Sequence, residues 1–507
     1  MVVGGRTGRL GRGSVQYRVL AASLGDQENP LPSSQSEMEL SKPSQDQGLQ
    51  FVVPCVFMAS LSALCFGYHL SVVNGPLEAI TFSATGVTDN LVAQGLVVST
   101  LLMGATFGSL VAGKLADSMG RKKTLLLCGL VLALGPALCV ILPGLVPQAT
   151  RFSALILGRV ITGVGVGIAS SICPLYISEV SPNKLRGSLG SVNQLTICVG
   201  IVLGLLANLI YSASQWRIMF LWSTLPGASL AFCAQWVLPE SPRYLASRNL
   251  GDKAREAALR LWGSTSQALE EARSMLNTTP GMEEEEEEES PSEKREKPSI
   301  FSKKYRKVLT MCVMMFVFQQ MSGINSIVFY SSSIFRQVGI QSTALASLTV
   351  GVVNMLGTGA TCFLIDKMGR RQLMQISYSS MAIAIVVMAA STLSGTAGWA
   401  SVMILVSVIA YVLAFSLGAG AVPGLYVNEI APSSVRGQAG SAAFTTHWIM
   451  NIIIGQTFLQ LAEKFGISAM YFLFAAWCFG ALLFINKYAV ETKGRSMDEI
   501  AKAFVAS

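Results

Sequence analysis

The fold is decided by Gly113-Lys-Leu-Ala-Asp117-Ser-Met-Gly120-Arg121-Lys122 and, further along, by Leu175-Tyr-Ile-Ser-Glu179-Val-Ser-Pro182-Asn-Lys-Leu-Arg186-Gly187. Both stretches recur in the second half, as Asp366-Lys-Met-Gly369-Arg370-Arg371 and Leu425-Tyr-Val-Asn-Glu429-Ile-Ala-Pro432-Ser-Ser-Val-Arg436-Gly437. Asp117 and Asp366 lie 366 − 117 = 249 positions apart, and Glu179 and Glu429 lie 250 apart. A charged pattern that repeats in register between long apolar runs indicates a duplicated membrane bundle.

Composition agrees with this interpretation. The chain has 507 residues, of which 51% are hydrophobic and 13% charged, and its mean hydropathy is +0.51. These values are too apolar for a soluble protein of this length. Stretches of about 20 apolar residues, each long enough to cross a bilayer, are expected near 51–75, 91–113, 124–142, 152–175, 188–211, 216–238, 308–330, 343–365, 373–394, 400–424, 438–460 and 468–488.

Two groups of six such stretches predict an all-α membrane protein, with twelve transmembrane helices in two pseudo-symmetric halves. Duplicated bundles of this kind serve alternating access, so the repeat predicts a transporter. The expected segments are a tail (1–50), a first bundle (51–238), a central loop (239–307), a second bundle (308–490) and a short tail (491–507).

Lysine and arginine collect in the loops after the second, fourth, eighth and tenth spans. This asymmetry predicts that both termini and the central loop face the cytosol-like side. The net charge of +8 follows from that topology, and we infer no nucleic-acid partner from it.

The N-terminal tail carries Arg6, Arg9, Arg12 and Arg18 before its first acidic residue, Asp26. An arginine-rich opening without acids is typical of an organelle transit peptide, and a disordered basic tail is the alternative.

The central loop has two parts. Residues 252–276 have the spacing of an amphipathic helix, and the run Glu283 to Glu289 follows. A block of like charge repels itself and stays solvated. We interpret the run as a flexible linker, with a docking segment as the alternative.

At this point the motifs resemble a family. Together with Pro239-Glu240-Ser241-Pro242-Arg243, Gln319-Gln320-Met-Ser-Gly323-Ile-Asn325 and Val490-Glu491-Thr492-Lys-Gly494-Arg495, they resemble the sugar porters of the major facilitator superfamily over about 51–500. The runs Gly67-Tyr-His69-Leu-Ser-Val-Val-Asn74-Gly75, Ser416-Leu-Gly-Ala-Gly-Ala-Val-Pro423 and His447-Trp448 are most similar to the plastidic glucose transporter branch. The resemblance implies a hexose as substrate, glucose first. It also implies the inner envelope of a plastid, with the plasma membrane or another endomembrane as the alternative.

Amides within an apolar span carry the expected site. An unpaired amide in hydrocarbon is costly, so Gln319, Gln320 and Asn325 must face the bundle interior or a cavity. An amide both donates and accepts, which suits a sugar hydroxyl; hydrogen bonding between helices is the alternative. On a regular helix Gln320 and Asn325 would point about 140° apart, and Gly323 offers a place to unwind. By the resemblance, the substrate-binding residues are Gln194, Gln319, Gln320, Asn325, Tyr330, Asn354, Trp448 and Asn451.

Two departures from the family pattern bear on selectivity and coupling. Ser416 and Gly424 stand where many hexose facilitators carry a Glu and a Trp, so a wider cavity or a shifted selectivity is expected. His69 stands where proton-coupled sugar porters carry an Asp. Histidine can titrate near neutrality, but facilitators have an uncharged residue there. We therefore predict passive transport, with proton-coupled symport second and a sugar sensor third.

The loop charges are expected to act as a gate. Several pairs at the seam between the halves would bias which side is open, although each is worth little when exposed. Fixing the topology and capping helix ends is the alternative role. The expected set is Asp117, Arg121, Glu179, Arg186, Glu240, Arg243, Asp366, Arg370, Glu429 and Arg436, joined by Arg159 because an intramembrane arginine needs a partner.

No nucleophile–base pair, phosphate-binding loop or metal-ligand spacing is present, so we expect no enzyme, cofactor or metal site. All ten cysteines fall in apolar spans and are interpreted as packing. The expected partners are a monosaccharide and the lipid bilayer, with a monomer as the working unit.

Overall fold

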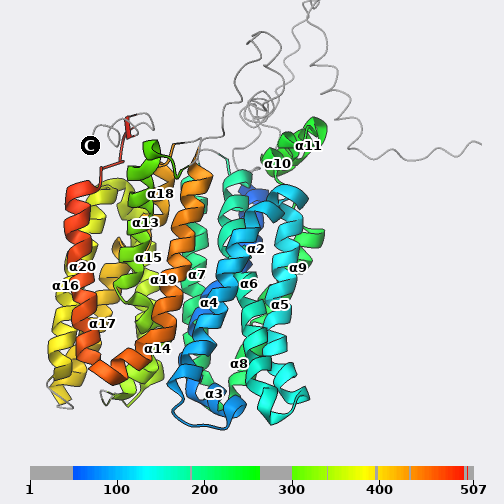
Figure 1. Ribbon diagram of the computed structural model, residues 1–507. Coiled ribbons are helices and arrows are strands. Elements are labelled where there is room, and N and C mark those ends of the chain that lie inside the picture. Colours follow the sequence, from blue (N-terminus) through cyan, green and yellow to red (C-terminus); the bar gives the residue numbers. More distant parts are fainter. Residues whose placement is uncertain are drawn as a thin grey trace, which may run out of the picture. The chain divides into compact units, whose positions relative to one another are not determined.

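The computed structural model describes residues 49–182, 185–262, 300–337, 339, 341–393, 398–432, 435–495 and 499–500. All of them belong to one compact unit, Gln45–Ser507. Within these residues every regular element is a helix (Figure 1). The tail arginines, the acidic run and residues 263–276 of the expected amphipathic helix lie outside the described residues.

The first half of the bundle begins with α2 and ends with α9. Its helices are α2 (Leu49–Ser71), α3 (Leu77–Thr85), α4 (Leu91–Met119), α5 (Arg121–Leu145), α6 (Gln148–Val180), α7 (Arg186–Ile210), α8 (Trp216–Trp222) and α9 (Thr224–Trp236). Two short helices follow it, α10 (Pro242–Ser247) and α11 (Gly251–Trp262), above the bundle in Figure 1. We call this end of the bundle the inner end and the opposite one the outer end.

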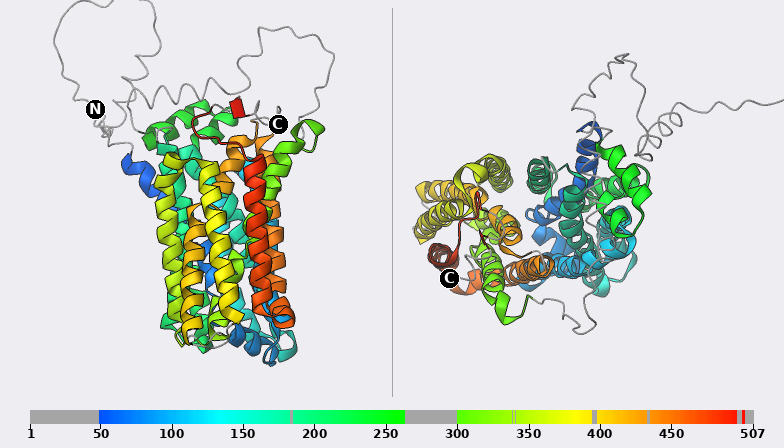
Figure 2. Two further views of the ribbon diagram at one scale, coloured as in Figure 1. Left: turned by 90° about the vertical axis from the view of Figure 1, so that its left-hand side faces the viewer. Right: turned by 90° about the horizontal axis from the view of Figure 1, so that it is seen from above.

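The second half begins with α13 and ends with α20. Its helices are α13 (Arg306–Met321), α14 (Ile324–Gln337), α15 (Thr343–Met368), α16 (Arg370–Leu393), α17 (Gly398–Leu417), α18 (Val422–Ile430), α19 (Arg436–Phe465) and α20 (Ile467–Tyr488). Seen along the bundle, the helices form two groups (Figure 2). The groups meet where α4 packs on α19 and α7 packs on α15.

Eleven candidate spans in the described residues have the length and apolarity of a membrane-crossing segment. The twelfth predicted span, α19, is 30 residues long but falls short of that apolarity. Polar side chains such as His447, Asn451 and Gln456 lie along it. Because α19 packs against α4 on one side and α13 on the other, its polar face is covered by protein rather than by lipid.

Glycines allow the closest helix contacts. A Cβ atom on Gly104 of α4 would lie 2.2 Å from the Val160 carbonyl oxygen, and one on Gly163 of α6 would lie 2.0 Å from that of Leu101. Only a residue without a side chain fits, and small residues are the usual means by which helices approach in membranes.

Three breaks divide long spans and place the polar groups. Residues 72–76 separate α2 from α3, and residues 418–421 separate α17 from α18. The third break lies at Ser322 and Gly323, where Gly323 has φ +89°, a conformation that favours glycine. The prediction that Gly323 interrupts its span is confirmed.

The described part of the central loop contains the beginning of the expected amphipathic helix. The structure places a helix at Gly251–Trp262, and the rest of the expected range 252–276 lies outside the described residues. Ala254, Ala257, Ala258 and Leu261 form its buried face, as the spacing predicted. The Trp262 indole nitrogen donates to the Val180 carbonyl at 2.8 Å, which ties α11 to the end of α6.

Candidate functional site

The break between α13 and α14 brings four polar side chains together. The Gln320 amide nitrogen lies 3.2 Å from the Gln319 side-chain oxygen and 2.7 Å from Nδ1 of His447. The amide nitrogen of Asn325 donates to the Gln320 side-chain oxygen. Unwinding at Gly323 therefore joins Gln320 and Asn325, which a regular helix would have pointed apart.

Gln319 holds the neighbouring break in place. Its amide nitrogen donates to the carbonyl oxygens of Ala419 at 2.7 Å and Gly420 at 3.0 Å. Both carbonyls belong to the turn between α17 and α18, where no intrahelical partner satisfies them. Gln319 is thus occupied by backbone, while Gln320 and His447 form the polar surface beside it.

Helix α19 adds two polar groups without partners. Trp448 and Asn451 are buried, and neither the Trp448 indole nitrogen nor the Asn451 side-chain oxygen has a hydrogen-bond partner in the described residues. The Trp448 ring lies 5.7 Å from that of Phe66 on α2, so it contacts the other half. Buried polar groups without partners are rare and are what a hydroxyl-bearing ligand would satisfy.

Gln194 lies on α7 of the first half and Asn354 on α15 of the second, where these two helices pack together. Gln194 is half-buried and makes no hydrogen bond within the described residues. The Asn354 amide lies 3.9 Å from the Cys198 sulfur of α7. Asn354 also lines a small pocket between α7, α14, α15 and α17, whose other polar groups are Ser331 and Ser347.

Tyr330 is placed differently from the other expected site residues. It is fully buried, its hydroxyl donates to the Gly455 carbonyl, and its ring stacks on Phe458 at 5.7 Å between centroids. These contacts pack α14 against α19. In this conformation Tyr330 supports the wall of the site and does not line a cavity.

His69 and Arg159 lie buried in the first half. Both His69 ring nitrogens lack a partner in the described residues. The Arg159 Nε donates to the Val97 carbonyl at 2.9 Å, and its guanidinium carbon lies 5.7 Å from the Phe220 ring centroid. Arg159 precedes Glu179 by 20 residues on α6, about 30 Å at 1.5 Å per residue. The expectation that Arg159 joins the loop charges is therefore wrong: a backbone carbonyl and an aromatic face serve as its partners.

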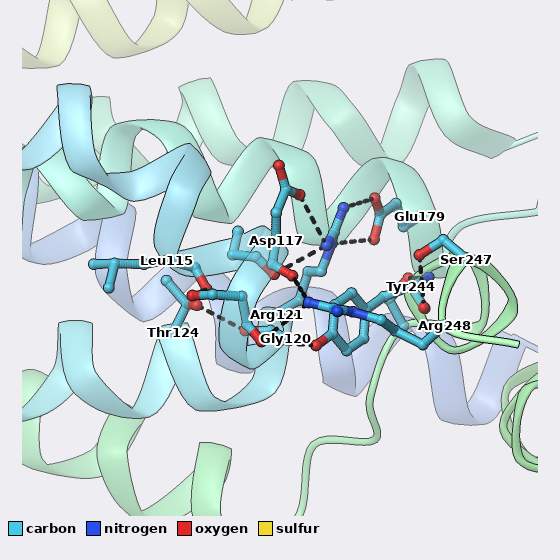
Figure 3. A network of polar contacts seen from close by, with 12 residues as sticks. Leu115, Asp117, Gly120, Arg121, Thr124, Glu179, Tyr244, Ser247 and Arg248 are labelled. Carbon is cyan, nitrogen blue, oxygen red and sulfur yellow. Dashed lines mark hydrogen bonds and ion pairs between the residues drawn. The ribbon is translucent and has the colours of Figure 1, made fainter. Parts of the chain in front are cut away.

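The first inner network surrounds Arg121 (Figure 3). Arg121 makes two parallel hydrogen bonds to Glu179, at 2.9 and 3.0 Å, and one to Asp117 at 3.3 Å. Glu240 accepts from the backbone N–H groups of Arg121 and Lys122 at 2.9 and 3.2 Å and so caps the start of α5.

The second inner network repeats this arrangement around Arg370. Arg370 pairs with Glu429 at 2.9 Å, and Glu429 also accepts from the Thr492 hydroxyl at 2.6 Å. Glu491 accepts from the backbone N–H groups of Arg370 and Arg371 at 2.8 and 3.0 Å, capping α16.

The described ion pairs at the inner end thus join residues of the same half, whereas the sequence placed these charges at the seam between the halves. Arg243 is exposed, and Arg436 donates to the Ala431 carbonyl at 3.2 Å. The side chains of Arg186 and Asp366 lie outside the described residues.

Two residues of the site were missed from the sequence. Glu491 is the counterpart of Glu240, 251 positions later, and the repeat spacing could have identified it. The sequence drew attention to His447 only through the His447-Trp448 run of the resemblance. Its bond to Gln320 joins α19 to α13, a pairing that depends on helix rotation, which one sequence does not reveal.

Contacts between the halves close the outer end. The Asn74 amide nitrogen donates to the Val328 carbonyl and the Ser331 hydroxyl, both at 2.7 Å, and its oxygen accepts from the Ser332 N–H at 2.9 Å. Beyond it, Glu78 of α3 pairs with Arg336 of α14 at 3.0 Å. The outer ends of α3 and α14 are therefore joined.

Comparisons with known proteins identify relatives over almost the whole chain. Residues 55–504 match the family described as "Sugar (and other) transporter". Plastidic glucose transporter 4 of Arabidopsis thaliana is 41% identical over 492 residues, which cover 96% of this chain and 85% of that protein. Facilitated glucose transporter protein 1 of Caenorhabditis elegans is 32% identical, over 88% of this chain and 89% of that one.

A solved structure shows the same fold. The inward-open conformation of the xylose transporter XylE from E. coli superposes with a TM-score of 0.74 at 26% identity, covering 89% of this chain and 100% of that chain. The plastidic relatives support the plastid location expected from the sequence. Members of this family are carriers, so the prediction that the chain is not an enzyme is confirmed. The chain is a multi-pass membrane protein and belongs to the sugar transporter family.

Proposed function

We propose that this protein carries a hexose, glucose first, across a plastid envelope membrane by passive alternating access. The observation that carries the proposal is the cluster of Gln320, Asn325 and His447 at a helix break, beside the unpartnered polar atoms of Trp448 and Asn451. Broken helices inside a two-half bundle are where transporters bind substrate. The names of the plastidic and facilitated glucose transporters support the substrate class.

In this proposal sugar hydroxyls replace contacts that the amides now make with one another. Gln320 and Asn325 each both donate and accept, so they can exchange a mutual bond for bonds to a hydroxyl. Gln194 and Asn354 approach from the α7–α15 contact, and Trp448 offers an apolar face to the C–H side of a pyranose. Gln319 remains tied to the α17–α18 turn and positions the cluster. Tyr330 acts through packing.

The surroundings of His69 support passive transport. The charge of Arg159 acts on His69, and neither residue pairs with an acidic side chain in the described residues. Protonating His69 would add a second uncompensated cation inside the bundle, which is costly. A neutral His69 gives the carrier no site for coupling a proton to sugar at this position.

In this proposal the inner networks keep each half rigid during alternation. Each caps the start of one helix and ties it to a second helix of the same half, while the seam between the halves stays free to open. The closed outer end and the within-half ion pairs support an inward-facing state. We retain 51–238 and 308–490 as the two moving bodies and a monomer as the working unit.

The site is tested by sugar saturation. Gln320→Ala should raise the half-saturating glucose concentration by about 5- to 160-fold, because leaving its polar partners unpaired costs about 1–3 kcal/mol. Gln375→Ala is the matched control, because Gln375 is a half-buried glutamine on α16 whose side chain bonds only Asn486 in the described residues. Equal saturation curves for Gln320→Ala and the wild type would place the sugar elsewhere.

A further inference from the structure

The chain enters α13 through a short segment rich in cations, residues 301–307. Lys303, Lys304, Arg306 and Lys307 are all exposed there. Residues 300–310 include no acidic residue, and none of the four cations makes an ion pair with the described residues. Surface cations are often unpaired, but four within five positions form a concentrated positive field.

The segment lies where the membrane surface is expected. The candidate span that contains α13 and α14 starts at Lys303, so the cations stand at its inner boundary. Ile300, directly before the segment, is fully buried, and its N–H donates to the Gln438 side chain at 2.9 Å. This bond ties the segment to the first turn of α19 at the inner end.

An apolar ring accompanies the charges. Phe301 is 76% exposed, although it adjoins the fully buried Ile300. Lys304 lies 5.4 Å above the ring of Tyr305, so a second aromatic side chain belongs to the same segment. Cations beside aromatic rings at the end of a span are typical of the interface between headgroups and acyl chains.

We propose that residues 301–307 bind anionic phospholipid headgroups of the inner leaflet. The cations attract the phosphodiester charge, as clusters of four or more Lys and Arg next to a span do. Phe301 inserts at the level of the acyl chains. An acidic peptide, such as the chain's own Glu283 to Glu289, would satisfy the cations but leave the exposed ring without a role, which favours lipid.

The test compares lipid association of the full-length protein in vesicles. Electron paramagnetic resonance of spin-labelled phosphatidylglycerol and phosphatidylcholine reports the fraction of each lipid held at the protein. The wild type should prefer phosphatidylglycerol, and neutralising the four cations (K303Q, K304Q, R306Q and K307Q together) should lower that preference by at least about fivefold, the factor expected for one cation near an anionic surface. Raising the salt concentration should weaken the preference of the wild type.

A matched variant removes the same charge elsewhere on the inner face. Lys114→Gln, Lys123→Gln, Lys253→Gln and Arg260→Gln together neutralise four exposed cations of α4, α5 and α11, and should keep the preference. Phe301→Ser should shorten the residence of the bound lipid while leaving the salt dependence. Equal losses in both quadruple variants would overturn the proposal. So would a wild type that shows no preference until Glu283 to Glu289 are replaced by serine, because the acidic run would then be the occupant.

Discussion

The two inner networks have the same geometry, but the pKa values of their capping glutamates are shifted in opposite directions. In each, a glycine with positive φ precedes a helix that a glutamate caps through two backbone N–H groups: Gly120 with Glu240, and Gly369 with Glu491. Burial raises the pKa of Glu240, and bonds from Ser241, Lys122 and Arg121 offset only part of this. Burial also acts to raise the pKa of Glu491, but four backbone N–H bonds outweigh it and the pKa lies below its ordinary value.

The difference shows what duplication preserves. The repeat keeps the backbone geometry and the pairs Arg121–Glu179 and Arg370–Glu429, because these hold the helix ends together. The two capping glutamates, Glu240 and Glu491, have come to differ in how buried they are and in how many backbone N–H groups donate to them. The halves are therefore equivalent as scaffolds and unequal in their response to loss of charge.

The largest expected effect comes from removing each arginine. Arg121→Ala should cost about 3 kcal/mol of stability, because it leaves Glu179 buried with no cation. Arg370→Ala should cost about 1–2 kcal/mol less, because Glu429 keeps its hydrogen bond from Thr492. Thermal unfolding of the purified variants measures both, with the exposed Lys253→Ala as control. Equal losses in the two arginine variants would remove the asymmetry between the networks.

The two glycines give an intermediate effect. A Cβ atom on Gly120 would lie 2.3 Å from a Glu240 carboxylate oxygen and 2.9 Å from the Tyr244 ring. On Gly369 it would meet Glu491 at 2.7 Å. Both positions also have φ near +90°. Gly120→Ala should therefore cost about 2 kcal/mol and Gly369→Ala about 1 kcal/mol.

Gly113→Ala is the control for both glycine variants, since nothing lies within 4 Å of its added Cβ. It should leave the unfolding temperature unchanged or raise it slightly. If Gly369→Ala lowered the unfolding temperature more than Gly120→Ala, the first network would have more space around its glycine than the second.

The smallest effect depends on pH. A lowered pKa means that Glu491 stabilises the fold above the ordinary glutamate value and that this contribution fades as pH falls. A raised pKa means that Glu240 contributes stability at low pH that is lost as pH rises through the raised value. Relative to the wild type, Glu491→Gln should thus be most harmful near neutrality, by about 0.5 kcal/mol. Glu240→Gln should be most harmful in acid. Unfolding temperatures between about pH 4 and pH 7 measure the two slopes, and slopes of one sign would contradict the assigned environments.

The sequence predicted the parts of the fold that repeat along one helix axis. The register of the two copies, the interruption at Gly323 and the buried face of α11 all follow from spacing within one segment. The span at 438–460 was predicted from its apolar stretch, and α19 forms there although polar residues such as His447 and Asn451 interrupt that stretch.

The sequence did not reveal how each helix is rotated about its axis, or at which depth in the bundle its side chains meet those of other helices. Arg159 needed a partner, but nothing in the sequence indicated that a backbone carbonyl and the Phe220 ring would serve. The repeated motifs identified the charged residues of the loops. They did not show whether these residues form ion pairs within one half or between the halves, because that depends on how far the seam is open. The same limit applies to two residues near the turn at Gly323. Tyr330 of α14 packs against α19 instead of lining the site, and His447 of α19 bonds Gln320 of α13.

Uptake under a proton gradient decides whether the carrier moves hexose passively, as proposed. Full-length protein in proteoliposomes should bring labelled glucose to equal concentrations inside and outside. The final level should be the same with an imposed pH gradient, with a protonophore, and in His69→Asn. The opposite result is accumulation of glucose above the external concentration, abolished both by the protonophore and by His69→Asn. It would contradict passive transport and make His69 a coupling residue.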